Sequence, residues 1–143
     1  MAISSGVKVG VTRSSQIPTR WIDQGAHKAI RLAQTPNRYL AGVIEVALKD
    51  HMSDKTNWRK MLTNNIDADT DLVEFKGEVE EMLPMDLADY ICDEDDVLEI
   101  KYPVSQYPLK VKSVGLDKTN IVQGQLIGIK GQYLIFNDGL VLM

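Results

Sequence analysis

Residues 40–51, with the sequence LAGVIEVALKDH, form the most regular pattern in this chain of 143 residues. Apolar side chains recur every three or four residues, which is the spacing of one face of an α-helix. This face consists of Leu40, Val43, Ile44, Ala47, Leu48 and His51. Glu45 lies at the flank of the stripe, because each residue turns a helix by about 100°. The pattern predicts a helix that packs on a core, with His51 as a core histidine.

The segment before this helix is predicted to contain short strands and one short helix. Residues 7–12 (VKVGVT) are rich in β-branched side chains and alternate, which favours a strand. A Ser-Ser-Gly turn precedes them, and residues 1–3 are too short to make a full strand pair, so we expect the chain to begin inside its first strand. Residues 18–24 are predicted to form a helix that Gly25 ends, and residues 29–33 a further strand.

The segment after residues 40–51 continues with helices. Residues 56–62 are expected to resume the helix after a short break, and the polar residues 64–70 to form a joint. A second stripe predicts a helix over residues 72–83 that Pro84 ends. This stripe consists of Leu72, Phe75, Lys76, Val79, Met82 and Leu83. A short helix is expected around residues 87–91, followed by an exposed acidic turn at residues 93–96.

The last third of the chain changes to short, β-rich segments separated by proline- and glycine-containing turns, which is typical of a small antiparallel sheet or part of a barrel. Strands are predicted over residues 97–102, 109–114, 121–129, 132–136 and 140–143. The last of them runs to Met143, so we expect the chain to stop early as well. The fold class predicted is α+β, with a small sheet and helices in residues 1–62, an acidic helical segment in 63–96 and a small β unit in 97–143 packed on the first part.

Composition and charge limit the classes of function. Residues 1–61 carry a net charge of +6 and residues 62–143 a net charge of −10, so the basic half is the one suited to a polyanion. The single cysteine, Cys92, excludes a disulfide framework within the chain and a Cys-rich zinc site, and no basic group near it in sequence would activate it. The sequence has neither an apolar run long enough to span a membrane nor a signal-peptide pattern, and we expect a cytoplasmic protein without a membrane partner.

The common catalytic motifs are absent, and one constellation of residues stands out. There is no phosphate-binding P-loop and no His-Glu-x-x-His pattern, and the glycines at 124, 128 and 131 do not have dinucleotide-binding spacing. What stands out is Lys8 before a glycine at the end of a strand, then Arg20 on a short helix, then Glu45 on a long helix.

This order of residues resembles the GIY-YIG nuclease superfamily over residues 1–62. Residues 8–13 (KVGVTR) are similar to the second motif of phage-type members, and Glu45 with the later Trp58 is similar to their glutamate helix and its trailing tryptophan. The resemblance implies metal-dependent cleavage of nucleic acid, and it implies a first-motif tyrosine upstream of Met1. Glu45 would hold Mg²⁺ or Mn²⁺, Arg20 would contact the phosphate, and Lys8 would assist the attacking water or bind phosphate.

The whole chain also resembles an uncharacterised bacterial family of unknown function. The resemblance rests on three segments, which are residues 8–13, residues 17–26 (IPTRWIDQGA) and residues 128–135 (GIKGQYLI). Members of that family are longer, with a Cys-rich segment upstream and a short β tail downstream. The resemblance therefore implies a chain truncated at both ends or a short member.

Each candidate residue also has a purely structural interpretation. Arg20 has Asp23 as a helical neighbour and Glu45 has Lys49, and both pairs are spaced for surface ion pairs. Lys8 is expected to be a solvated strand residue under this interpretation, and both tryptophans are expected at or near the core.

Two alternatives to a nuclease remain open. The first is a non-catalytic nucleic-acid-binding module with a basic face made by Arg13, Arg20, Arg31 and Arg38. The second is a protein-interaction module. An unpaired strand edge from Val7 to Val11 predicts association of two copies of the chain, because such edges invite strand addition.

Overall fold

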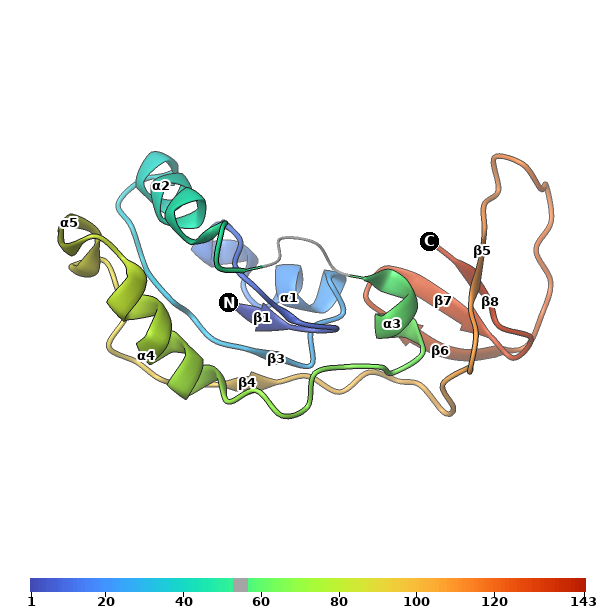
Figure 1. Cartoon of the computed structure of the whole chain (residues 1–143). Helices are drawn as coiled ribbons and strands as arrows, with labels where there is room; N and C mark the ends of the chain where they lie inside the picture. The colour runs from blue at the N-terminus through green and yellow to red at the C-terminus, as the bar shows by residue number, and fades with distance from the viewer. Residues whose placement is uncertain (53–56) are drawn as a thin grey trace.

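The computed structural model describes residues 1–52 and 57–143, which form an α+β fold with two small sheets (Figure 1). The first sheet has the strand order β2-β1-β3-β4, with every neighbouring pair antiparallel. Its strands are β1 (Ala2–Ile3), β2 (Val7–Lys8), β3 (Lys28–Ala29) and β4 (Leu98–Glu99). The second sheet has the order β5-β8-β7-β6. Its strands are β5 (Lys112–Val114), β6 (Leu126–Lys130), β7 (Tyr133–Phe136) and β8 (Leu140–Leu142).

Two long helices build the core of the first part of the molecule. The helix α2 (Arg38–Leu48) begins at Asn37, whose side chain accepts a hydrogen bond from the Leu40 amide, and α4 (Leu72–Met82) begins at Asp71 in the same way. Their apolar faces and the first sheet enclose one hydrophobic core. Its buried members are Met1, Ile3, Ile30, Leu32, Ile44, Leu48, Leu72, Val79, Leu83 and Leu87. Both predicted helices are confirmed.

The histidine at the end of the first predicted stripe is exposed. The helix α2 ends at Leu48, so His51 lies beyond its last turn and no longer follows the helical spacing. The prediction of a core histidine is therefore wrong, because the stripe was extended past the end of the helix.

The lysine in the second stripe is buried, as its position in the stripe implies. Lys76 is 1% exposed. Its ammonium group donates to the carbonyl oxygens of Cys92 and Glu94 and forms an ion pair with Asp95 at 3.0 Å. The acidic segment after the short helix α5 (Met85–Ala88) thus wraps around a buried cation.

The helix α3 (Trp58–Leu62) belongs in sequence to the first half but packs on the second sheet. Met61 and Leu62 are buried against Ile135 and Val141, and the Trp58 ring stacks on that of Tyr133 with centroids 6.0 Å apart. Figure 1 shows α3 beside β6 and β7 of the second sheet, between the two sheets. The expected position of Trp58 at a core is confirmed. The predicted start of this helix at residue 56 lies outside the described residues.

The strands differ from the sequence-based expectation in extent and partners. Residues 1–3, which were expected to be too short to pair, contain β1, which is hydrogen-bonded on both sides, to β2 and to β3. Residues 9–13 leave the sheet, so the strand expected over 7–12 is only two residues long. The strand expected over 97–102 contributes β4 to the first sheet, where it pairs with β3.

The strand β3 also begins and ends earlier than the predicted 29–33. Within the second sheet β5 and β8 are parallel, and the other pairs are antiparallel.

The predicted helix at 18–24 is confirmed as α1 (Thr19–Asp23), which follows a 3₁₀ turn, η1 (Ser14–Gln16). Gly25 follows α1 with a φ of 69°, a left-handed conformation that suits glycine and ends the helix. The helix carries Arg20 and Trp21, which line a hollow together with the segment that follows β2.

Candidate functional site

Two adjoining hollows lie between α2, α1 and the segment that follows β2. Seven residues line both, and they are Met1, Val9, Gly10, Val11, Thr12, Trp21 and Glu45. The first hollow has a volume of about 130 Å³ and extends toward residues 30–35. The second has a volume of about 200 Å³ and extends toward Lys8 and Arg20.

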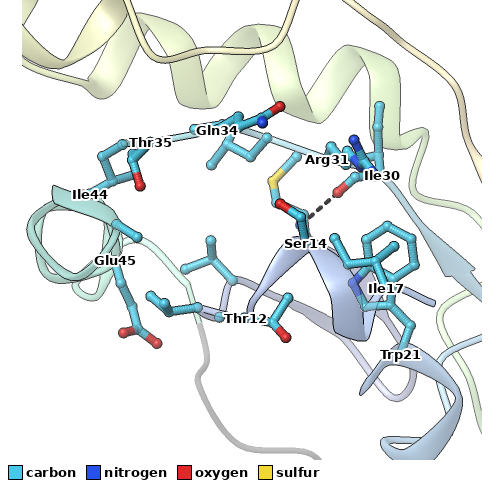
Figure 2. Close-up of a pocket in the computed structure, with 17 residues that line it drawn as sticks. Thr12, Ser14, Ile17, Trp21, Ile30, Arg31, Gln34, Thr35, Ile44 and Glu45 are labelled. Atoms are coloured by element: carbon cyan, nitrogen blue, oxygen red, sulfur yellow. Dashed lines mark hydrogen bonds between the residues drawn. The ribbon is translucent and has the colours of Figure 1, made fainter. Parts of the chain in front are cut away.

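The shape of the first hollow follows from the early end of β2. Residues 9–12 leave the sheet after β2 and line the hollow opposite α2. Figure 2 shows Ile44 and Glu45 on α2 opposite the segment that carries Thr12, with Trp21 and Ile17 on another wall. At Gly10, apart from its chain neighbours, no atom of the described residues lies within 4 Å of the position that a Cβ would take, so the backbone here borders open space.

The three residues singled out from the sequence line the second hollow together. Lys8 comes from β2, Arg20 from α1 and Glu45 from α2. Lys8 and Glu45 are partly buried, and Arg20 is exposed. Residues far apart in sequence therefore meet at one pocket.

The ion pairs of the structural interpretation do not form. In residues 1–52 and 57–143, neither Arg20 with Asp23 nor Glu45 with Lys49 comes within ion-pair distance; the ion pair found joins Lys76 and Asp95. The side chains of Arg20 and Glu45 are thus not engaged by the helical neighbours that the sequence offered.

The charges around the two hollows are mostly positive. Lys8, Arg20 and Arg31 line them, while Glu45 is the one carboxylate among the described lining residues. A wall with this balance attracts anions and tolerates one cation beside Glu45.

Sequence reasoning missed Thr12. Its hydroxyl oxygen is buried and has no hydrogen-bond partner among the described residues, and the residue lines both hollows. A buried hydroxyl without a partner costs about 1–3 kcal/mol, so a group that enters the hollow and bonds to Thr12 would recover this energy. The only indication in the sequence was its place in the motif-like run at 8–13.

A metal at this site would have few protein ligands. Within the described part of the chain, no group of three or more His, Cys, Asp or Glu side chains is arranged to hold a metal ion. Magnesium is commonly held by one or two carboxylates, with waters and substrate phosphates completing its shell. Glu45 fits that donor set and does not fit a zinc site, which needs several nitrogen or sulfur ligands.

The structure and the site together define a small α+β protein with a cation-lined pocket beside a single carboxylate. The chain belongs to the family described as "Protein of unknown function (DUF2797)", whose model matches residues 1–143. No curated protein and no solved structure matches it. Of the helices that the structure describes, none is long and apolar enough to cross a membrane.

Proposed function

We propose that the second hollow binds a phosphodiester of a nucleic acid and catalyses its hydrolysis with a divalent metal held by Glu45. The observation that supports this most directly is the convergence of Lys8, Arg20 and Glu45 on one hollow. The resemblance of residues 1–62 to the GIY-YIG nucleases supports the same assignment of roles.

Each residue has a role that suits its chemistry and position. The exposed guanidinium of Arg20 binds two phosphate oxygens at once and positions the diester at the mouth of the pocket. Lys8 adds a positive charge that stabilises the negative charge developing on the phosphoryl group. Glu45 provides the oxygen ligand for Mg²⁺ or Mn²⁺, and the metal, when bound, supplies Lewis-acid polarisation of a phosphoryl oxygen.

The reaction balances without any further reagent. Water forms a bond to phosphorus, the ester P–O bond breaks, and the leaving oxygen takes up a proton. Since hydrolysis involves no change of oxidation state, the pocket needs only to bind, orient and neutralise charge.

A metal titration tests the proposal. Mn²⁺ is titrated by calorimetry into the full chain, into Glu45→Gln and into Glu78→Gln, which removes an exposed acid on α4 as a matched control. We expect saturable binding in the wild type and in Glu78→Gln, and none in Glu45→Gln. Labelled single- and double-stranded DNA and RNA are then incubated with Mn²⁺, and cleavage should disappear in both Glu45→Gln and Arg20→Met.

Two results would overturn the catalytic proposal. The first is equal Mn²⁺ binding by the wild type and Glu45→Gln. The second is metal binding at Glu45 without cleavage of any of the four substrates. If the chain binds these substrates without cleaving them, and binding weakens steeply with salt, it is the non-catalytic nucleic-acid-binding module.

A second candidate function is association through the first sheet. The strand β2 (Val7–Lys8) is the outermost strand of that sheet, and residues 9–12 leave the sheet after it, so the edge predicted from Val7 to Val11 is shortened to two residues. We propose that two copies associate through this outer strand. A strictly monomeric mass by light scattering at millimolar concentration would exclude this pairing.

A further inference from the structure

A separate hollow lies where the first sheet meets the end of β6. It has a volume of about 350 Å³, and Lys130, Tyr102, Tyr107 and His27 form its walls. Among the described residues, none lines both this hollow and the two hollows around Glu45. Its chemistry can therefore be considered independently of the proposed nuclease site.

The wall of this hollow contains a buried lysine. Lys130 is 1% exposed, and its ammonium nitrogen lies 5.4 Å from the ring centre of Tyr102 and 5.0 Å from that of Tyr107. Within residues 1–52 and 57–143, no ion pair and no hydrogen bond engages this ammonium group. Two aromatic faces stabilise a cation, but they accept no strong hydrogen bond from it.

A comparison with Lys76 shows which partners the buried ammonium group of Lys130 lacks. Lys76 is equally buried, and it has two carbonyl oxygens and the carboxylate of Asp95 as partners. Buried charges in proteins are normally paired in this way. The ammonium group of Lys76 is surrounded by acceptor oxygens, whereas Lys130 lines an open hollow.

A buried histidine lines the same hollow. Both ring nitrogens of His27 are buried, and neither makes a well-aligned hydrogen bond among the described residues, although the backbone of Ile3 and Asp67 interacts with the ring and partly offsets the lowering of its pKa. Burial and the positive charges of Lys130 and Lys28 lower the pKa of His27, so the ring is neutral at pH 7 and carries one N–H donor.

The two tyrosines differ in what their hydroxyl groups do. The Tyr102 hydroxyl donates to the Ala26 carbonyl oxygen at 2.7 Å, which fixes its ring beside the lysine. No hydrogen bond engages the hydroxyl of Tyr107 within the described part of the chain, so it can serve as a donor. Lys28 and Lys101 add positive charge to the walls against one carboxylate, that of Glu99.

We propose that this hollow binds a terminal phosphate group, with the Lys130 ammonium, the Tyr107 hydroxyl and a His27 N–H as its donors. The three lysines favour the dianion of a phosphate monoester over a singly charged carboxylate or a phosphodiester. The donors come from three separate segments that meet at this hollow, an arrangement that suits a compact, tetrahedral anion.

Inorganic phosphate is the probe that tests this proposal. It is titrated at pH 7 and constant ionic strength into the ¹⁵N-labelled full chain, with amide shifts near residues 27, 107 and 130 as the readout. We expect saturable shifts that become at least about tenfold weaker in Lys130→Met, because a charge-assisted hydrogen bond is lost. Lys112→Met removes an exposed lysine and should bind like the wild type.

A further variant separates the explanations. Tyr107→Phe removes only a hydroxyl and should weaken binding several-fold at unchanged melting temperature, which covers the case that Lys130→Met folds poorly. The shifts near residues 27, 107 and 130 report on this hollow and not on the one around Glu45, so failure of the nuclease proposal and failure of this one are distinguishable. Nucleoside monophosphate in place of phosphate identifies a nucleotide source, and acetate should not compete.

Two outcomes would overturn the proposal. One is the absence of saturation. The other is equal phosphate binding by the wild type, Lys130→Met and Tyr107→Phe.

Discussion

Buried polar side chains carry most of the information about function at the scale of single residues. Lys76 and Lys130 have the same exposure, but one is surrounded by acceptors and the other faces a hollow. The position of Lys76 in a helical stripe predicted its burial. Its partners could not be predicted, because they come from a turn 16 to 19 residues further along the chain.

The pH dependence of anion binding is a prediction at this scale. Desolvation lowers the pKa of Lys130 to about 8, so its charge is present at pH 7 and is lost as the pH rises through 8. Sulfate is the suitable ligand, because it stays a dianion over this pH range and any change in its affinity therefore comes from a group of the protein. We expect sulfate affinity to fall about tenfold between pH 7 and 9, in the wild type and not in Lys130→Met.

The other titratable groups at the hollow do not produce the same change. Burial and the lysine charges hold the pKa of His27 down, and burial raises the pKa values of Tyr102 and Tyr107, so these three stay neutral from pH 7 to 9. Among the described residues, the other charged groups that line it are Lys28, Lys101 and Glu99, and the carboxylates of Asp67 and Asp23 interact electrostatically with His27 and Tyr102. Sulfate affinity that is constant with pH would show that Lys130 does not bind the anion.

At the scale of elements, the helices followed from the sequence and the strands did not. The spacing of Leu40, Ile44 and Leu48 predicts α2, because a helix is made of local contacts. The strands of the first sheet are two residues long, and β3 pairs with β4 about 70 residues away, so no local pattern defines their ends.

Part of the candidate site follows from the sequence. The order of motifs predicts Lys8, Arg20 and Glu45 as site residues, and the structure places all three on one hollow, while their roles stay a prediction. Thr12 and the Lys130 hollow were not found, since both depend on where distant segments pack.

Two glycines make a matched test of element structure. Gly25 has a φ of 69° and lies against the Met61 side chain, whereas Gly42 is inside α2 with open space where a Cβ would be. Gly25→Ala should lower the free energy of unfolding by about 1–3 kcal/mol. Gly42→Ala should raise it by about 0.5–1 kcal/mol through helix propensity. Urea unfolding followed by circular dichroism measures both, and effects of the same sign would contradict this account.

At the scale of the whole molecule, α3 ties the first half of the chain to the second sheet. Leu62 is fully buried against side chains of the second sheet, although it lies in the first half of the chain. We expect Leu62→Ala to lower the free energy of unfolding by about 2–5 kcal/mol.

The cooperativity of unfolding provides the control for the prediction on Leu62→Ala. Because α3 packs on the second sheet, the fluorescence of Trp58, which stacks on Tyr133, should change at the same urea concentration as the helical signal. A Trp21→Phe background leaves Trp58 as the only fluorophore of its kind. Two separate transitions would show that the parts unfold independently.

The same packing of α3 has a consequence for synthesis on the ribosome. Met61 and Leu62 emerge well before Ile135 and Val141, which cover them in the finished fold. At about 5–20 residues per second, their apolar surface waits on the order of ten seconds for its partners. The apolar side chains of Met61 and Leu62 therefore stay uncovered while the residues between them and the second sheet are synthesised.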